Sequence, residues 1–424
     1  MRIGVDYLIL GGGIAGTTAA ETIRRDDKDG KIAILSGESH VLYSRVLLPA
    51  YVQGRIPREK VFLRTLTDYE RNAIQLFLGE SAVVVDAEKK EVQTSAGNTF
   101  FFEQLLISTG GQVQPWRVGR SVPDVARLQT LNDADDLIAR IHRTTKKHAV
   151  VVGAGFIGME FVNSLVANGF SVDLITKDGG CWFGHLGKDG SDFLEMAFPR
   201  NRVALHPASE VSDIKLDAGT YLIRTTRNDK LEAGLLAVGI GLERNLTSFQ
   251  GQGFEIGKGI KTNEYLETNF PYVWAAGDIA EYYNVHTKKH ALVGNWSHAF
   301  LQGRAAGLNM SAAHLHKKTK TVFEDVPTYS ITVLGNHVTF LGDSVIEGSK
   351  ETLARADEHG RFFEKFFLKD NLLVGAIMIN KFEDKKVLEA LIKHQVDITT
   401  LKPFLVRPEA SIKDLDLHEV IPQT

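Results

Sequence analysis

With 424 residues, 43% of them hydrophobic and 24% charged, the chain is long enough for two to four globular domains. Its formal net charge of −3 gives no overall attraction to nucleic acid or to an anionic membrane, and no apolar run approaches the roughly 20 residues that span a bilayer. The single cysteine, Cys181, excludes an intrachain disulfide and a cysteine-rich metal or iron–sulfur site. The first strand begins almost at Met1, which leaves no room for a signal peptide, so we expect a cytoplasmic protein. We also expect no metal centre.

The first predicted elements are a strand, a glycine-rich turn and a helix. The apolar run Tyr7–Leu10 leads into the fingerprint Gly11–Gly16, and a helical pattern then continues through Arg24. In such a motif the first glycine permits a tight turn, the second lets a pyrophosphate approach the backbone, and the third lets the helix pack on the strand. The free N–H groups at the helix start then bind the anion.

A second strand, Lys31–Leu35, is followed by Glu38, whose carboxylate is suited to accept ribose hydroxyls of an adenosine. The alternative is a surface glutamate at a strand end. Further along, Ala82–Val85, Glu91–Gln93 and Thr99–Phe102 predict a small antiparallel ribbon. The strand Leu105–Ile107 then ends at Ser108–Gly111.

The same order of parts recurs in the second segment, which indicates a weak internal duplication. The strand Ala149–Val152 leads into the fingerprint Gly153–Gly158 and a helix through Asn168. The strand Ser171–Ile175, a ribbon near 202–225 and the strand Leu235–Val238, which ends at Gly239–Gly241, complete the segment. Two fingerprints a domain apart predict two dinucleotides in one protein, and the usual reason to hold two is to pass a hydride between them.

Pro115 and Trp116 mark the crossover into the second segment, and the chain returns near Asn245. We expect a helix and a strand before the apolar run that ends at Gly277–Asp278, and then a helix over Trp296–Met310. The polar run His314–Lys320 is expected to be a solvated linker. Antiparallel strands within Ser330–Leu341 and Arg361–Ile379 and a helix over Lys385–His394 predict a smaller α+β domain.

With both fingerprints, Thr109–Gly110 and Gly277–Asp278 in this order, residues 5–310 resemble the two-dinucleotide flavoprotein reductases. These are relatives of rubredoxin and ferredoxin reductases and of the flavin module of NAD(P)H nitrite reductase. The segment Tyr43-Ser44-Arg45 is similar to one that these reductases place beside the FAD pyrophosphate. The resemblance implies an α/β fold with two Rossmann-like domains, the NAD(P)H domain inserted in the FAD domain, and a C-terminal α+β domain. The implied FAD-binding parts are 1–113 and 242–315, the NAD(P)H domain is 114–241, and the C-terminal domain is 321–424.

The resemblance also implies two sets of cofactor-binding residues. Asp278 would accept a ribityl hydroxyl of FAD, although an unrelated helix N-cap has the same local pattern. The helix start at Trp296 would direct N–H groups at the pyrimidine edge of the flavin, and packing in a domain core is the alternative for that tryptophan. The FAD set is Gly11, Gly13, Ile14, Ala15, Gly16, Glu38, Ser39, Arg45, Ala82, Val83, Thr109, Gly110, Gly277, Asp278, Trp296, Ser297 and His298. The NAD(P)H set is Gly153, Gly155, Phe156, Ile157, Gly158, Thr176, Lys177 and Gly239.

Glu160, in the first helical turn after the second fingerprint, is the candidate catalytic residue, because the resembling family often has a glutamate near the nicotinamide and flavin N5. The alternative is an acidic residue favoured by the helix dipole. Thr176 and Lys177 stand where an NADH enzyme carries its ribose-binding acid, and they favour NADPH. Asp178 follows directly and keeps NADH open.

The chain departs from the family pattern at two places. Ala50 stands where reductases of small iron–sulfur proteins carry a lysine that pairs with the glutamate near N5, and here the segment is closer to the nitrite-reductase flavin module. No cysteine lies beside the flavin-binding motifs, which excludes disulfide, coenzyme A disulfide and peroxide reductases. Cys181 is expected to be an incidental thiol.

We therefore expect an FAD-dependent oxidoreductase that takes hydride from NAD(P)H and passes electrons to a small redox protein of rubredoxin or ferredoxin type. One alternative is an NAD(P)H oxidase or quinone or dye reductase with a small-molecule acceptor. Another is a non-catalytic flavin-containing redox sensor or interaction protein. The pairs Phe362–Phe363 and Phe366–Phe367 are compatible with a homodimer face or with a domain core.

Overall fold

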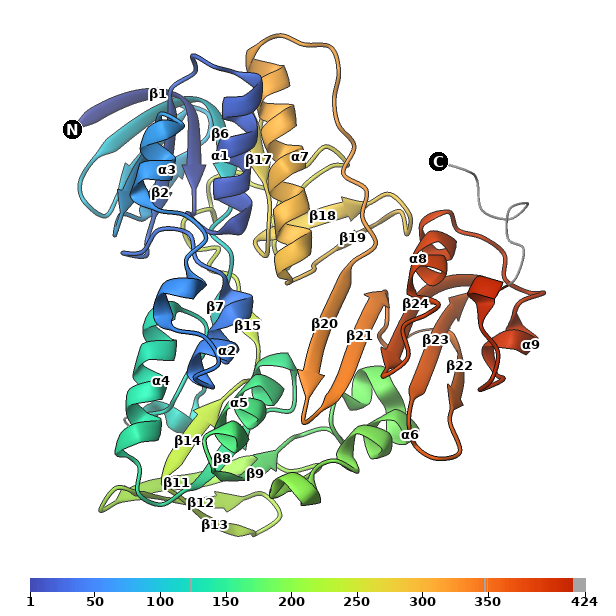
Figure 1. The fold of residues 1–424 in the computed structure, drawn as a ribbon. Helices are drawn as coiled ribbons and strands as arrows, with labels where there is room; N and C mark the ends of the chain where they lie inside the picture. Colours follow the sequence, from blue (N-terminus) through green and yellow to red (C-terminus); the bar gives the residue numbers. More distant parts are fainter. Residues whose placement is uncertain (123, 347, 349, 415–424) are drawn as a thin grey trace. The chain divides into compact units, whose positions relative to one another are not determined.

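The computed structural model describes residues 1–122, 124–346, 348 and 350–414 (Figure 1). The chain forms two compact units. The first comprises Met1–Leu47, Pro57–Gln112 and Leu242–Asp325, and the second comprises Leu48–Ile56, Val113–Gly241 and Val326–Thr424. Residues 415–424, the end of the expected C-terminal domain, lie outside the described residues. The chain leaves the first unit along β7 (Gln112–Val113) and re-enters it at β15 (Leu242–Glu243).

A parallel sheet forms the centre of the first unit. Its strands lie in the order β3 (Ile74–Leu78), β2 (Ile32–Ser36), β1 (Arg2–Leu10), β6 (Thr99–Ile107) and β17 (Val273–Ala275). The predicted antiparallel ribbon is present as β4 (Ala82–Asp86), β5 (Glu91–Thr94) and the first half of β6. The sequence predicted two strands where β6 is one, because the polar pair Glu103–Gln104 interrupts the apolar pattern. Gln104 is nevertheless buried and continues the pairing with β1.

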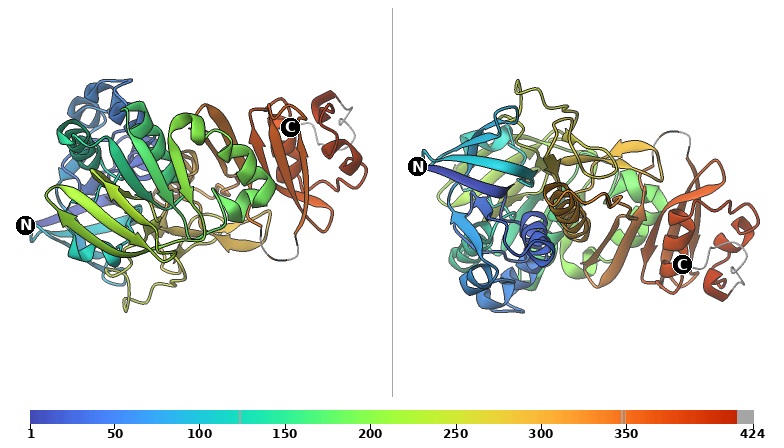
Figure 2. Two further views of the ribbon diagram at one scale, coloured as in Figure 1. Left: turned by 90° about the horizontal axis from the view of Figure 1, so that it is seen from below. Right: turned by 90° about the horizontal axis from the view of Figure 1, so that it is seen from above.

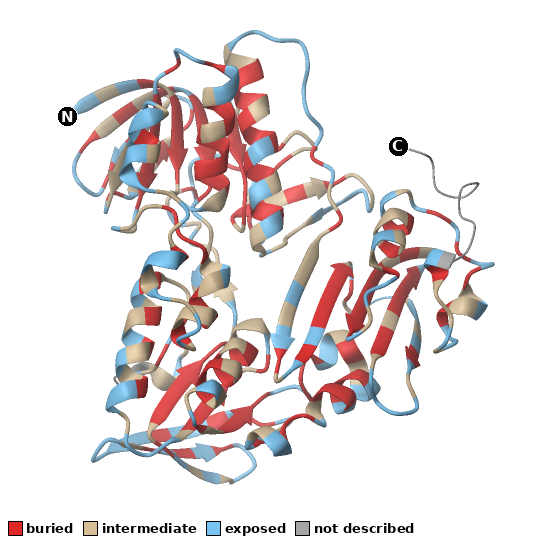
Figure 3. Cartoon of the chain, in the orientation of Figure 1, coloured by how far each residue is buried: buried red, intermediate tan, exposed pale blue. Residues whose placement is uncertain are grey.

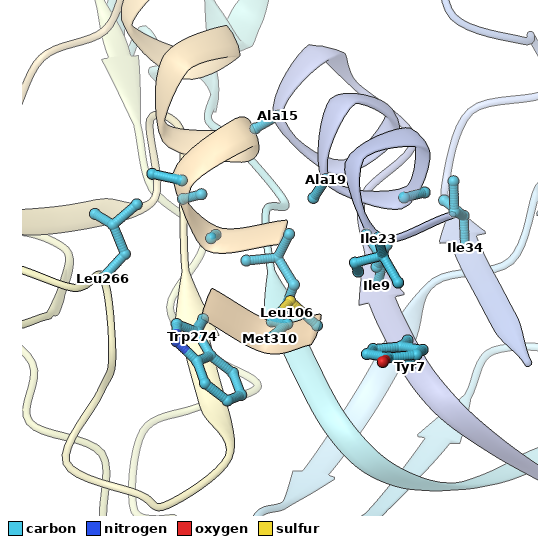
Figure 4. Packing of buried hydrophobic residues seen from close by; sticks show 14 of the residues in the cluster. Tyr7, Ile9, Ala15, Ala19, Ile23, Ile34, Leu106, Leu266, Trp274 and Met310 are labelled. Atoms are coloured by element: carbon cyan, nitrogen blue, oxygen red, sulfur yellow. The ribbon is translucent and has the colours of Figure 1, made fainter. Parts of the chain in front are cut away.

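Helices α1 (Ile14–Asp26) and α7 (Trp296–His314) lie side by side on this sheet (Figures 1 and 2). Their contact depends on small residues, because a Cβ on Gly303 would overlap the carbonyl oxygen of Ala15, and one on Gly307 would lie 2.7 Å from that of Ala19. The backbones therefore approach closely. The core beneath the helices is apolar, and Figure 4 shows Tyr7, Ile9, Ile23, Ile34, Leu106, Leu266, Trp274 and Met310 packed there.

The other elements of the first unit are short. They are α3 (Leu66–Arg71), β16 (Ile260–Lys261), β18 (Ala280–Asn284) and β19 (Lys289–Ala291). Residues 242–272 are all described and contain no helix, so the prediction of a helix before Val273 is wrong. Glycines at 251, 253, 257 and 259 explain the difference, because glycine is a poor helix former.

The second unit contains the other parallel sheet, in which three strands are almost entirely buried and the edge strand β10 is partly exposed (Figure 3). Its order is β10 (Val203–His206), β9 (Ser171–Ile175), β8 (His148–Val152) and β14 (Leu235–Val238). Helices α2 (Leu48–Val52), α4 (Leu131–Arg143), α5 (Phe156–Ala167) and α6 (Phe183–Glu195) accompany it. The antiparallel ribbon is β11 (Val211–Asp217), β12 (Thr220–Thr225) and β13 (Lys230–Ala233). It was predicted near 202–225, but residues 203–206 pair in parallel with β9 and belong to the main sheet.

A five-stranded antiparallel sheet with α8 (Lys385–Lys393) forms the rest of the second unit. Its order is β20 (Thr328–Val333), β21 (Asn336–Gly342), β24 (Leu372–Ile379), β23 (Phe363–Lys369) and β22 (Glu351–Ala356), of which β22 was not predicted. The short helix α9 (Lys402–Leu405) follows. Phe363, Phe366 and Phe367 are buried in this sheet, as the domain-core alternative predicts, whereas Phe362 is partly exposed.

Among the helices of the described residues, none is both long enough and apolar enough to cross a membrane.

Candidate cofactor-binding sites

The first fingerprint forms a turn that has no room for a side chain at its first and last glycines, Gly11 and Gly16, but is open at the middle one, Gly13. A Cβ on Gly11 would overlap the carbonyl oxygen of Ser108, and one on Gly16 would overlap that of Gly11. Gly13 precedes the first residue of α1, and a Cβ on it would have no atom within 4 Å. The backbone is thus exposed where the N–H groups at the start of α1, those of Ile14 and Ala15, have no partner within the helix. The geometry fits a pyrophosphate held at a helix N-terminus.

Glu38 lies just beyond the carboxyl end of β2, beside this turn. Its Oε2 accepts the Tyr43 hydroxyl at 2.5 Å, and its Oε1 accepts Arg45 Nη2 at 2.6 Å. Each partner of the ion pair keeps about a third of its side chain exposed (35% for Arg45 and 33% for Glu38), whereas Ser39 is exposed. The structure therefore brings the predicted ribose acceptor and the predicted phosphate-binding arginine together.

The start of β4 lies close to the same place. The Gly79 N–H donates to the Glu38 carbonyl at 3.0 Å, and the Glu80 N–H donates to the Ser36 carbonyl at 2.8 Å. Two predicted residues follow within three positions: Ala82, which is partly buried, and Val83, whose side chain is exposed.

Gly277 and Asp278 lie beside the start of α1. A Cβ on Gly277 would lie 3.3 Å from that of Ala15, and the positive φ of +79° favours glycine there. Thr109 and Gly110 follow the buried end of β6. The Ser108 hydroxyl, just before them, donates to the Leu10 carbonyl of β1 at 2.9 Å and so joins this end of β6 to the first strand.

Burial raises the pKa of Asp278, and the guanidinium groups of Arg244 and Arg45 oppose this rise. Arg244 Nε also donates to the Asp278 backbone carbonyl at 2.9 Å. The sequence analysis did not identify Arg244, because nothing in its local pattern distinguishes it from a surface arginine.

A buried polar chain supports the Gly277 backbone from α7. Asp325 accepts from His298 Nδ1 at 2.7 Å, and Gln302 Nε2 lies 3.1 Å from His298 Nε2. Gln302 Oε1 in turn accepts the Gly277 N–H at 2.6 Å. The His298 side chain is therefore an internal support, and Gln302 and Asp325 are site residues that the sequence analysis missed.

The start of α7 presents backbone N–H groups that are not used within the helix, as the resemblance implied. Asn295 is the N-cap, and its side chain accepts the His298 N–H at 2.8 Å. The N–H groups of Trp296 and Ser297 have no partner within the helix. Ser297 is exposed and Trp296 is partly exposed, so the tryptophan lies outside the buried core.

The second fingerprint repeats the geometry of the first. A Cβ on Gly153 would lie 2.5 Å from the Gly239 carbonyl oxygen, and one on Gly158 would overlap that of Gly153. Gly155 precedes α5, and the nearest atom to a Cβ there would be 4.0 Å away. Both turns therefore offer an open middle glycine at a helix start. Ile157 is partly buried in the first turn of α5.

The residues after β9 differ in what they offer a cofactor. Thr176 is 4% exposed, and its hydroxyl accepts the Asp178 N–H at 3.2 Å, so this side chain closes a turn. Its predicted contact with a 2′-phosphate finds no support in this geometry. Lys177 and Asp178 are exposed.

Glu160 lies just after the first turn of α5 and is partly buried. Burial raises the pKa of its carboxyl to about 7, and a hydrogen bond from the Tyr329 hydroxyl opposes the rise. Tyr329 belongs to β20, far along the chain, and no sequence signal connected the two residues. Cys181 is fully buried with Sγ 3.9 Å from the Ala154 carbonyl oxygen, and burial raises the pKa of this thiol.

Comparison with known proteins identifies the family of the chain. Residues 5–303 match the family model described as pyridine nucleotide-disulphide oxidoreductase. The chain belongs to this family. The resemblance to two-dinucleotide flavoprotein reductases and the predicted two-Rossmann α/β fold are confirmed, and the protein is an oxidoreductase of the flavin- and pyridine-nucleotide-dependent type.

Individual relatives cover nearly the whole chain. It is 29% identical over 407 residues to the NADH-dependent phenylglyoxylate dehydrogenase subunit epsilon of Aromatoleum evansii, which is 95% of each protein. It is 26% identical over 404 residues to the NAD(P)H nitrite reductase of Bacillus subtilis (strain 168), which is 95% of this chain but 49% of that longer protein. Among solved structures, the Ferredoxin Reductase for the CYP199A2 System from Rhodopseudomonas palustris superimposes with a TM-score of 0.86 at 23% identity, over 96% of this chain and 98% of that one.

Proposed function

We propose that the protein takes hydride from NAD(P)H onto FAD and passes the electrons to a separate small redox protein of ferredoxin or rubredoxin type. The observation that carries the proposal is the pair of glycine turns, each open at its middle glycine, in a chain with one cysteine. Two dinucleotides fit hydride transfer, and one thiol cannot form the disulfide that would accept electrons within the chain. The name of one relative, the ferredoxin--NAD(+) reductase component of the p-cumate 2,3-dioxygenase system of Pseudomonas putida, supports a protein acceptor.

The roles follow from the chemistry of each group. FAD would lie in the domain formed by 1–113 and 242–315, with its pyrophosphate at Gly13 and its adenosine ribose on Glu38. Arg45 would bind phosphate oxygens, Asp278 would accept a ribityl hydroxyl, and the N–H groups at the start of α7 would stabilise negative charge on the flavin. The remaining FAD residues of the proposal are Gly11, Ile14, Ala15, Gly16, Ser39, Ala82, Val83, Thr109, Gly110, Gly277, Trp296, Ser297 and His298.

NAD(P)H would lie in the domain formed by 114–241, with its pyrophosphate at Gly155 and Glu160 near the nicotinamide. Lys177 favours NADPH, because its ammonium is free to approach a 2′-phosphate from the surface, while Asp178 is suited to the ribose hydroxyls of NADH. When both cofactors are bound, they supply the hydride chemistry, and the protein supplies position and electrostatics.

An anaerobic titration of the purified protein tests the first step. Either NADPH or NADH should bleach the flavin absorption band, and a flavin that stays oxidised with both would refute the proposal. Stopped-flow reoxidation with ferredoxin, rubredoxin, quinone and oxygen then tests the acceptor. Fast reoxidation by one of the two iron–sulfur proteins is expected. If oxygen or quinone reoxidises the flavin fast and neither iron–sulfur protein does, the protein is instead an oxidase or a quinone reductase.

A further inference from the structure

One face of α5 is bound to the β20–β21 hairpin. Phe156, Glu160 and Asn163 are spaced so that they share this face. The Phe156 ring centroid lies 4.4 Å from that of Tyr329 and 5.0 Å from that of Phe340, both in edge-on geometry. All three side chains of this face contact the hairpin, because Asn163 is also bound to it.

Asn163 fixes the tip of the hairpin. Its side-chain amide donates to the Thr332 carbonyl, and its Oδ1 accepts the Leu334 N–H at 2.9 Å. The hairpin is therefore anchored on both sides of Glu160, by an aromatic contact at one end and by paired hydrogen bonds at the other. Tyr329 has little freedom to move away from the carboxyl that it binds.

No cationic side chain of the described residues is among the influences on the pKa of Glu160. Within the described residues, burial and the Tyr329 hydroxyl are the two influences on its pKa. His185 lies beyond Phe156, and its Nδ1 is bound to the Ser344 carbonyl at 2.9 Å.

Other titratable groups on the elements packed against α5 are engaged elsewhere. Tyr51 of α2 donates to Asp135 of α4 at 2.8 Å. On β8 and β9, His148 and Asp173 are bound to each other at 2.7 Å.

We propose that Tyr329 is a positioning residue for the reductase reaction, and that its hydroxyl holds the Glu160 carboxyl at the second fingerprint. This inference rests on the proposed function. Within the described residues, the Tyr329 hydroxyl is the hydrogen-bond donor to the Glu160 carboxyl. A phenol donates one hydrogen bond without adding a charge, so Glu160 can change its own charge near neutral pH.

The charge of Glu160 has a consequence for nicotinamide binding. An ionised carboxylate attracts the cationic ring of the oxidised cofactor, but it has no such attraction for the neutral ring of the reduced cofactor. The affinity for NAD(P)⁺ should therefore increase as pH rises through the pKa of Glu160, about 7, while the affinity for NAD(P)H changes much less.

The test compares Tyr329→Phe with Tyr221→Phe in the FAD-loaded protein. Tyr221 is the matched control, because it is a buried tyrosine of the same unit whose hydroxyl donates to the Asp124 carbonyl. The titration of the Glu160 carboxyl is followed by infrared spectroscopy with ¹³C-labelled glutamate, using Glu160→Gln to assign the band. NAD(P)⁺ affinity is measured over the same pH range.

Loss of the Tyr329 hydrogen bond should raise the titration midpoint by about one pH unit, because the hydroxyl stabilises the ionised form. Tyr221→Phe should leave it unchanged, and Glu160→Gln should abolish the pH step in NAD(P)⁺ affinity. An unshifted midpoint in Tyr329→Phe, an equal shift in Tyr221→Phe, or a step that persists in Glu160→Gln would overturn the inference. The infrared titration does not depend on hydride transfer, so failure of the proposed function appears separately, as a flavin that NAD(P)H does not bleach.

Discussion

Alanine substitution at the open glycines separates cofactor binding from folding. At Gly13 the backbone angles, φ −74° and ψ −171°, suit any residue, and no atom lies within 4 Å of an added Cβ. Gly13→Ala should therefore leave the free energy of unfolding of the apoprotein unchanged or raise it by about 0.4–1 kcal/mol, because alanine restricts the unfolded chain. The methyl group would instead occupy the space through which a pyrophosphate reaches the backbone N–H groups.

The expected loss is in flavin affinity. A displaced phosphate gives up charge-assisted hydrogen bonds worth about 1.5–3 kcal/mol, which corresponds to a roughly 10- to 150-fold increase in the Kd for FAD. Flavin fluorescence quenching on the apoprotein measures the Kd, and urea unfolding measures stability.

Two comparison variants define the result. In Gly16→Ala the added Cβ overlaps the Gly11 carbonyl oxygen, so this variant should lose about 1–3 kcal/mol of stability. Gly155→Ala should weaken NAD(P)H binding but leave flavin binding intact, because its position is as open as that of Gly13. The reasoning is refuted if Gly13→Ala binds FAD normally, or if it destabilises the apoprotein as much as Gly16→Ala does.

Three further predictions concern stability and nucleotide choice. Arg355→Met should cost about 3–5 kcal/mol in denaturant unfolding, because it removes the nearest cation from two fully buried carboxylates, Glu364 at 2.6 Å and Asp384 at 2.9 Å, and leaves Glu364 only the more distant Lys381 at 3.8 Å. Burial already raises the pKa of Glu364, and loss of the cation raises it further, so the cost should be smaller at pH 5 than at pH 8; a cost independent of pH would contradict this. Gly303→Val should lower the Tm and weaken FAD retention, since the helix backbones could no longer approach, and an unchanged Tm would contradict the packing. Lys177→Ala should reduce kcat/KM for NADPH about fivefold, and Asp178→Ala should reduce kcat/KM for NADH by a similar factor. If both kcat/KM values are unchanged, other residues determine the choice between NADPH and NADH.

Much of the architecture was predictable from local sequence. Each fingerprint encodes a strand, a turn and a helix within about 20 residues, and the role of each glycine depends on neighbours in the same turn. The structure accordingly shows Gly16 and Gly158 packed against their own loops, while Gly13 and Gly155 are open. The predicted helix before Val273 is absent from the described residues, because glycines at 251, 253, 257 and 259 disfavour a helix there.

The side chains that complete the sites were decided by the tertiary structure. Gln302 supports the Gly277 backbone, Arg244 lies at Asp278, and Tyr329 binds Glu160, yet each partner is distant in sequence or unmarked by local pattern. Sequence spacing specifies which groups can lie on one turn or one helix face, because those distances follow from backbone geometry. Contacts between distant segments depend on how sheets and helices pack. The sequence therefore determined the two glycine turns at which we propose that dinucleotides bind, and the packing decided which buried groups set the charge of the carboxylates beside them.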